Sequence, residues 1–314
     1  MKGPSIRKPI VDILMGTYNG AEFLNAQLES LCDQSYQSWK LTVSDDGSVD
    51  GTKDIVTKFA NRVDQTVTLK QGPLQGFSKN FITLVRDLPD ECEAVMFADQ
   101  DDIWLPEKIS KAVAALETTS SNRPLLYGSA SLIWNAATDR KKMSQRQRRE
   151  PGFLNALVEN FATGNTMLLN AAAVRELRDA SRVISNVYAH DWWAYALITG
   201  VGGQVIYDST STLLYRQHQG NEIGAGETFL KRQLRNLSVA DGRYRKKVGQ
   251  TVNALTLVQS KLTEENRQLL QKFSRARDAR TPVDRLLRMM RTGVYRQSLR
   301  DTAGFWGAVA LGKV

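Results

Sequence analysis

The sequence predicts an α/β protein in which helices flank a mixed, mostly parallel sheet and a helical extension follows. Over about the first hundred residues, short apolar runs alternate with amphipathic segments, which is typical of parallel strands joined by right-handed helical crossovers. Polar clusters follow three of these apolar runs. From about Phe229 onward, apolar residues recur at helical spacing to the end of the chain.

Hydrophobic periodicity defines the expected elements in order. Strands are expected at residues 10–18, 39–48, 65–72 and 93–102, and helices at 21–34, 52–60 and 77–88. A helix at 104–117 would carry Pro106 in its first turn, where proline is tolerated. Beyond it we expect strands within 125–134, 160–170 and 201–218, a loop at 139–149 with six basic residues, and a helix at 187–200.

Composition and charge indicate a globular protein with two unlike halves. The chain has 314 residues, 42% hydrophobic and 24% charged, with a net charge of +9. From Gly226 onward, 19 basic residues face 7 acidic ones, a net of +12, so the preceding residues carry −3. We therefore expect a first unit at residues 1–225 and a basic helical region at 226–314. The basic region would serve membrane association or oligomerisation. Alternatively, its charges simply form a helical face exposed to solvent.

The cysteines and the lengths of the apolar runs indicate the cellular compartment. Cys32 and Cys92 have no metal-binding or disulfide spacing, which favours a reduced, cytosolic setting. The N-terminal run, broken by Pro9 and Asp12, does not resemble a signal peptide. No run approaches the roughly 18 apolar residues that cross a bilayer, and the run 304–312 could only lie in its interface.

Three polar clusters lie where expected parallel strands end. They are Thr17-Tyr18-Asn19, Asp45-Asp46-Gly47-Ser48 and Asp99-Gln100-Asp101-Asp102. Because ligands of open α/β sheets bind beyond the carboxyl ends of the strands, these clusters should converge on one binding site.

The acidic cluster favours a metal site. Carboxylates delivered by a buried strand are costly unless a cation neutralises them, and Mg²⁺ or Mn²⁺ held by one or two carboxylates plus substrate phosphates meets that need. The alternative is an acidic loop with Asp102 as the N-cap of the next helix. Asp46 could accept a hydrogen bond from a base imide, or simply belong to a turn. Asp191, beside two tryptophans, could be a desolvated general base or only a helix cap.

Seven motifs in order carry a specific resemblance. They are TYNGAEFL (17–24), SDDGSVDGT (44–52), GFSKNF (76–81), ADQDDIWLPEKI (98–109), TGNTMLLN (163–170), HDWW (190–193) and YRQHQGN (215–221). Together they resemble the family-2 glycosyltransferases, particularly the bacterial rhamnosyltransferase and hexosyltransferase branch of surface polysaccharide synthesis. The resemblance covers roughly the first 225 residues and implies the GT-A fold, a Rossmann-like mixed sheet. Val49 departs from the threonine that many relatives have, a conservative change.

The resemblance also implies roles for individual residues. Asp191 would be the catalytic base, and Asp101, Asp99 and His218 would face the metal. The donor-binding residues would be Thr17, Tyr18, Asn19, Glu22, Asp46, Gly76, Lys79, Asn80, Asp99 and Gln100, with Asp46 on the base imide. The acceptor side would comprise Gly164, Asn165, Trp192 and Trp193.

The implied function is an inverting glycosyl transfer that depends on Mg²⁺ or Mn²⁺. The donor would be a dTDP- or UDP-linked rhamnose, glucose or galactose. The acceptor would be a saccharide or polyprenyl-diphosphate-linked glycan of O-antigen or capsule-type synthesis. Transfer would occur at the cytoplasmic face of the inner membrane, with homo-oligomers as an option.

The C-terminal residues are expected to reach that membrane. Residues 283–300 read as one basic amphipathic helix that binds anionic lipid, and the basic loop 139–149 could meet the acceptor phosphate. The alternative is a helix packed on the catalytic unit, its arginine stems covering apolar surface.

Two other classes of protein compete with this interpretation. A sugar nucleotidyltransferase would share the sheet and the carboxylates, but the segment MGTYNGAEF lacks its glycine-rich basic loop for a triphosphate. A nucleic-acid-binding protein would fit the pI of about 9.5. The chain shows no recognised nucleic-acid motif, so no nucleic-acid partner is expected.

Overall fold

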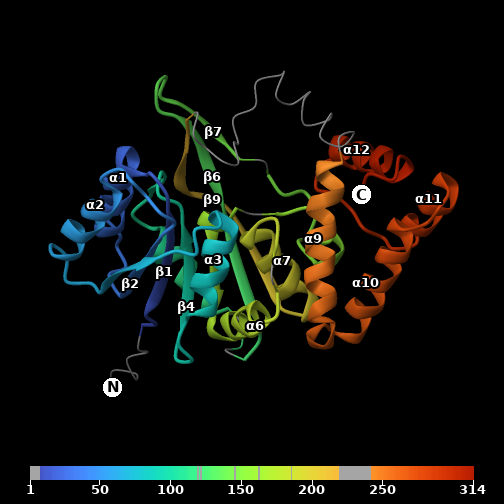
Figure 1. The fold of residues 1–314 in the computed structure, drawn as a ribbon, viewed down its shortest axis with the longest axis horizontal. Coiled ribbons are helices and arrows are strands. Elements are labelled where there is room, and N and C mark those ends of the chain that lie inside the picture. Colours follow the sequence, from blue (N-terminus) through green and yellow to red (C-terminus); the bar gives the residue numbers. More distant parts are fainter. Residues whose placement is uncertain are drawn as a thin grey trace.

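A mixed sheet of nine strands forms the centre of the protein (Figure 1). The computed structural model describes residues 8–218, apart from 119, 121, 145, 162 and 185, and residues 242–314. The strands are β1 (Val11–Thr17), β2 (Trp39–Asp45), β3 (Val67–Gln71), β4 (Ala94–Ala98), β5 (Ile103–Trp104), β6 (Leu125–Asn135), β7 (Arg140–Met143), β8 (Met167–Asn170) and β9 (Gln204–Gln217). Their order is β3-β2-β1-β4-β8-β6-β9-β5, with β7 on β6.

The strands β3, β2, β1 and β4 are parallel neighbours. Their register places Thr17 beside Asp45 and Met15 beside Ala98. The carboxyl ends of β1, β2 and β4 therefore lie at one edge, which confirms the predicted convergence of the polar clusters. Helices α1 (Ala21–Cys32), α2 (Thr52–Ala60) and α3 (Phe77–Arg86) follow the first three strands, also as predicted.

The second half of the sheet is less regular. Strand β8 runs antiparallel to both β4 and β6, and β9 runs parallel to β6 with irregular register between Ser129 and Leu132. The predicted loop at 139–149 is wrong in part, because β7 pairs with β6 there. Every side chain of β7 is exposed, so its sequence carries no alternating apolar pattern.

Three helices surround this second half. They are α4 (Lys108–Leu116), α6 (Ala171–Ser181), which was not predicted, and α7 (His190–Gly200), with the short helical turns α5 (Phe153–Ala156) and η1 (Gly164–Thr166). The predicted start of α4 is wrong, because Trp104 belongs to β5 and Pro106 precedes the helix.

Alternating side chains of β1 and β4 divide the core between the two faces of the sheet. Leu14 and Phe97 face one apolar cluster, whereas Ile13 and Met96 face the other. The first cluster continues into the C-terminal helices through Val248, Phe273, Met289 and Phe305. The C-terminal helices and the sheet therefore share one hydrophobic core.

The C-terminal helices extend away from α7, and the first of them packs against it while the others lie beyond (Figure 1). They are α9 (Arg243–Leu257), α10 (Glu264–Arg277), α11 (Pro282–Met290) and α12 (Leu299–Ala310), with the turn η2 (Gln259–Lys261). The predicted single helix at 283–300 is wrong: the chain breaks after Met290, and Gly293 adopts a positive φ of 73°. The expected boundary near 220–226 lies outside the described residues. Among the helices that the structure describes, none is long and apolar enough to cross a bilayer.

Candidate active site

A cavity of about 1230 Å³ opens at the edge where β1, β2 and β4 end. Its walls also include the start of α7, the end of β9, and parts of α9 and α12. Twelve of the predicted site residues line it: Thr17, Tyr18, Asp46, Gly76, Asn80, Asp99, Gln100, Asp101, Gly164, Asp191, Trp192 and His218. The fold therefore gathers residues that are far apart in the sequence into one compartment.

Hydrogen bonds join the ends of β1 and β2. Thr17 Oγ1 donates to Asp45 Oδ2 over 2.9 Å, and Asp45 also accepts from the backbone and side chain of Ser48. Asn19 Oδ1 accepts from the Val49 backbone, so this side chain holds the loop rather than lining the cavity. These bonds fix the wall against which a nucleotide would lie.

Asp46 anchors the loop that precedes α3. Its two carboxylate oxygens accept from the backbone N–H groups of Leu74 and Gly76, over 2.6 and 2.7 Å. Gly76 has a φ of +86°, a conformation that favours glycine. Each carboxylate oxygen keeps a second acceptor direction, so the predicted bond to a base imide stays a prediction.

Gln100 joins the acidic segment to the end of β1. Its side-chain amide exchanges two hydrogen bonds with the backbone of Tyr18, over 2.9 and 3.0 Å. A Cβ at Gly20 would lie 2.2 Å from Gln100 Oε1, so only glycine allows this approach. The amide that was expected to contact the donor is therefore engaged in shaping the cavity wall.

The far side of the acidic segment meets the end of β9. His218 Nε2 lies 2.7 Å from Asp101 Oδ2, and its ring packs against Phe23 with the centroids 4.3 Å apart. Arg216 Nε donates to the Asp101 carbonyl over 2.8 Å. The structure thus brings Asp101 and His218 together, and it adds Arg216, to which the sequence gave no role; that Asp101 and His218 face a metal stays a prediction.

Asp102 is fully buried behind the cavity. It accepts from Asn165 Nδ2 and from the Arg216 backbone. Lys108 is also buried, with Nζ 3.3 Å from Thr212 Oγ1, and burial lowers its pKa to about 7 while the negative charge of Asp102 acts in the opposite direction. Asp102 is therefore not an N-cap, and Asn165 supports the acidic segment from outside the cavity.

The acidic residues that do line the cavity fit a divalent cation held together with phosphates. Burial, followed by the charges of Asp101 and Asp191, raises the pKa of Asp99 to about 8. Within the described residues, no group of three or more potential ligands is arranged for a metal. Asp99 and Asp101 would supply one or two carboxylates to such a cation if substrate phosphates completed its shell.

Asp191 faces the cavity from the first turn of α7. Its carboxylate accepts from the backbone N–H groups of Gly164, over 3.1 Å, and Trp192, over 2.6 Å. Burial nevertheless raises its pKa to about 6. A carboxylate with such a pKa is suited to accept a proton near neutral pH.

The residues next to Asp191 hold it closely. His190 stacks on Phe81 with ring centroids 3.9 Å apart, and burial lowers its pKa to about 3, which keeps the imidazole neutral. A Cβ on Gly164 would approach His190 Nε2 to 2.5 Å, so this position requires glycine. His190 lines the cavity but was not among the predicted site residues.

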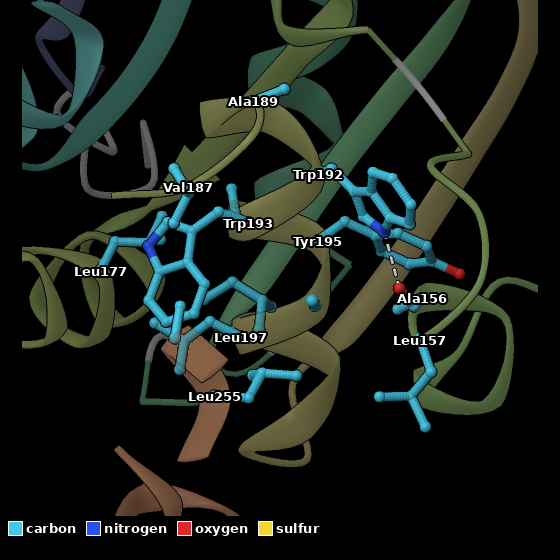
Figure 2. Close-up of a cluster of buried hydrophobic side chains, with 14 of the residues drawn as sticks. Ala156, Leu157, Leu177, Val187, Ala189, Trp192, Trp193, Tyr195, Leu197 and Leu255 are labelled. Carbon is cyan, nitrogen blue, oxygen red and sulfur yellow. Dashed lines mark hydrogen bonds between the residues drawn. The ribbon is translucent and has the colours of Figure 1, made fainter. Parts of the chain in front are cut away.

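The two tryptophans after Asp191 point in different directions (Figure 2). Trp192 lines the cavity, and its Nε1 donates to the Ala156 carbonyl over 2.7 Å. Trp193 is 1% exposed and packs among Leu177, Val187 and Leu255. The expectation that Trp193 faces the acceptor does not agree with this placement, whereas the acceptor role of Trp192 stays a prediction.

Glu22 and Lys79 also lie outside the cavity lining. Conversely, the lining includes residues that the sequence did not single out, among them Tyr188, Tyr215, Lys247 and Arg300. No local pattern indicates these side chains, because packing between distant segments brings them to the site.

Comparisons with known sequences agree with this geometry. The profile of glycosyl transferase family 2 matches residues 12–175. The dTDP-rhamnosyl transferase RfbG of Shigella flexneri is 28% identical over 248 residues, covering 77% of this chain and 84% of that protein. The UDP-Glc:α-D-GlcNAc-diphosphoundecaprenol β-1,3-glucosyltransferase WfgD of Escherichia coli is 27% identical over 126 residues, covering 40% of this chain and 47% of that protein.

Solved structures share the fold. TarS 1–349 of S. aureus in complex with UDP-GlcNAc superposes with a TM-score of 0.54 at 17% identity, covering 91% of this chain and 92% of that one. The mannosyltransferase PcManGT of Pyrobaculum calidifontis, in complex with GDP-Man and Mn²⁺, gives a TM-score of 0.52 at 16% identity and covers 98% of this chain and 86% of that one. At sequence identities this low, the likeness to the two solved structures shows a shared fold and nothing about substrate.

Proposed function

The chain belongs to glycosyl transferase family 2, and from this premise we propose that it transfers a hexose from a dTDP- or UDP-sugar with inversion and with the help of a divalent cation. The family makes it a glycosyltransferase and not a sugar nucleotidyltransferase. One observation supports the finer proposal: Asp99 and Asp101 line the same cavity as Asp191.

The donor side of the cavity would bind the nucleotide between the ends of β1 and β2. Asp46 has acceptor capacity for a base imide. Thymine and uracil both present such an imide, so this contact would not distinguish them. The name of the RfbG relative favours a dTDP-rhamnose donor over UDP-linked glucose or galactose.

Asp99 and Asp101 would hold Mg²⁺ or Mn²⁺, with His218 beside them. When bound, the cation supplies positive charge to the phosphates of the leaving nucleoside diphosphate. The described residues hold this acidic segment in place through Gln100 on one side and Arg216 on the other. Their bonds keep the carboxylates oriented toward the cavity before substrate arrives.

Asp191 would act as the base. The acceptor hydroxyl oxygen attacks the anomeric carbon, the bond from that carbon to the phosphate oxygen breaks, and the hydroxyl proton passes to Asp191. A single displacement of this kind inverts the anomeric configuration. The backbone donors Gly164 and Trp192 keep the carboxylate aimed at the cavity while burial raises its proton affinity.

The stereochemistry tests this proposal. Wild-type protein would be incubated with dTDP-rhamnose or UDP-glucose, Mn²⁺ and a panel of saccharide acceptors, and the anomeric configuration of the product determined by NMR. We expect a configuration opposite to that of the donor. A product with the donor's configuration would exclude a single in-line displacement, and would refute the role of Asp191.

We also propose peripheral binding to the anionic cytoplasmic face of the inner membrane, through a smaller surface than the sequence indicated. Arg285 donates to the carbonyls of Val309 and Ala310 and is thus used within the fold. Along α11, the exposed residues Val283, Leu287 and Met290 form an apolar stripe at a spacing of four and three. Exposed basic residues on or next to α11 are Arg280, Arg291 and Arg288, the last of which pairs with Asp284 over 2.7 Å. Apolar and basic groups on one exposed helix are typical of interfacial binding.

A further inference from the structure

An exposed leucine with an unusual backbone conformation lies on the donor side of the cavity. Leu74 belongs to the loop between β3 and α3, lines the cavity and is 63% exposed. Its φ is +59°, in the left-handed region that a bulky side chain rarely adopts. Such strained residues cluster at sites that contact ligands. Because the core does not cover this side chain, its placement points to a ligand contact.

Asp46 holds Leu74 in this conformation. The Leu74 N–H donates to Asp46 Oδ1 over 2.6 Å, and the Gly76 N–H donates to Asp46 Oδ2 over 2.7 Å. A Cβ added to Gly47 would lie 2.8 Å from Leu74 Cδ2, so the leucine side chain lies against the residue that follows Asp46. The apolar side chain and the carboxylate are therefore held next to each other in one part of the cavity wall.

This arrangement places an apolar group where thymine and uracil differ. In both bases the ring carbon C5 is two bonds from the imide nitrogen, and only thymine carries a methyl group on C5. A thymine whose imide donates to Asp46 would therefore hold its methyl group among the neighbours of that carboxylate. Of the large exposed apolar side chains in the described residues, those that line the cavity are Tyr18, Leu74 and Leu311. Among these, Leu74 is the one that bonds to Asp46.

We propose that Leu74 selects thymine over uracil by packing against the C5 methyl group of the base, so that the donor is a dTDP-sugar. The methyl group leaves water when it packs on the leucine, whereas uracil leaves the leucine exposed. This inference rests on the proposed function, because it assumes that Asp46 binds the base imide. It extends that function, since the imide contact alone accepts both bases.

Two pairs of nucleotides isolate the methyl group. The base is the only difference between dTDP and dUDP, and likewise between 5-methyluridine diphosphate and UDP. The dissociation constant of the wild type for each is measured by calorimetry with Mn²⁺ present. Burial of one methyl group strengthens binding about fourfold, so we expect this factor in favour of the thymine nucleotide within each pair. Equal affinity within either pair, or tighter binding of the uracil nucleotide, would overturn the inference.

Substitutions in the loop test the role of Leu74. In Leu74→Ala the preference for dTDP over dUDP should fall below about twofold, because most of the apolar contact is lost. Leu74→Met conserves apolar volume and should retain the preference of the wild type. Gln75→Ala is the matched control, since Gln75 is exposed on the same loop and does not line the cavity. A full preference in Leu74→Ala, or its loss in Gln75→Ala, would overturn the contact.

A further variant separates base selection from folding. Asparagine tolerates a positive φ better than leucine, so Leu74→Asn should not lower the free energy of unfolding, measured in urea. It should nevertheless bind dTDP and dUDP with nearly equal affinity, because its side chain is polar. A Leu74→Asn protein with the preference of the wild type would overturn the apolar contact.

Failure of the proposed function would give a different result. A wild-type protein that binds none of the four nucleotides in the presence of Mn²⁺ would refute the proposed function. A wild-type protein that binds all four with equal affinity would leave that function intact and overturn the selection of thymine by Leu74.

Discussion

Replacement of Asp191 by asparagine should abolish activity and stabilise the protein at the same time. Burial raises the pKa of this carboxyl from 3.8 to about 6. The unfolded chain therefore ionises first as the pH rises. The free energy of unfolding falls progressively as the pH rises from about 4 to about 6, and it stays at the lower value above that pH. With about 1.36 kcal/mol per pH unit, the difference amounts to about 3 kcal/mol, fully present at pH 7 and absent below pH 4.

Asparagine has a similar shape, carries no charge and keeps one acceptor oxygen for Gly164 or Trp192. The free energy of unfolding of Asp191→Asn minus that of the wild type should therefore increase by about 3 kcal/mol from pH 4 to pH 7. Urea unfolding at several pH values measures it, with Asp64→Asn, an exposed position, as the control. A difference that does not change with pH would refute the buried-carboxylate reasoning.

Catalysis should change in parallel. Loss of a general base lowers kcat by about 10²-fold or more. In the wild type, transfer should decline as the pH falls through about 6, because protonated Asp191 cannot accept the acceptor proton. Asp191→Asn with wild-type kcat would show that another group is the base.

Three further predictions concern the donor side and the membrane. Asp101→Ala should remove the dependence of nucleoside diphosphate binding on Mn²⁺, measured by calorimetry; unchanged Mn²⁺ dependence would exclude Asp101 as a ligand. Gly20→Ala should weaken nucleotide binding about tenfold or more, because the new Cβ would displace Gln100 from Tyr18; wild-type affinity would show that this contact does not shape the site. Leu287→Glu should abolish flotation of the protein with vesicles containing phosphatidylglycerol at low salt, while Glu265→Gln, on exposed α10, should not; equal flotation of the two would contradict the α11 surface.

The sequence was sufficient to predict that the polar ends of β1, β2 and β4 meet at one edge of the sheet. The apolar runs that lead to Thr17, Asp45 and Asp99 indicated buried strands. Parallel strands have their carboxyl ends at the same edge of a sheet, so these three residues were expected to lie close together. The acidic segment was identified because buried carboxylates require a partner or a function, whereas the role of Asp191 was implied by the family resemblance.

The rest of the cavity wall could not be predicted in this way. Every residue of α7 is buried, so its sequence has no apolar periodicity that would tell Trp192 from Trp193. Lys247 and Arg300 reach the cavity because α9 and α12 pack against the sheet core, a tertiary contact that no local pattern encodes. The break after Met290 was missed because the basic and apolar spacing continues across it.

The most direct test of the account is a crystal structure of the protein with Mn²⁺ and dTDP or UDP, in which anomalous scattering locates the metal. The account predicts a manganese peak bonded to Asp101 or Asp99 and to the diphosphate, with Asp191 facing the space beyond the terminal phosphate. A nucleotide bound elsewhere, or a diphosphate bound in this cavity with no metal at either aspartate, would contradict it.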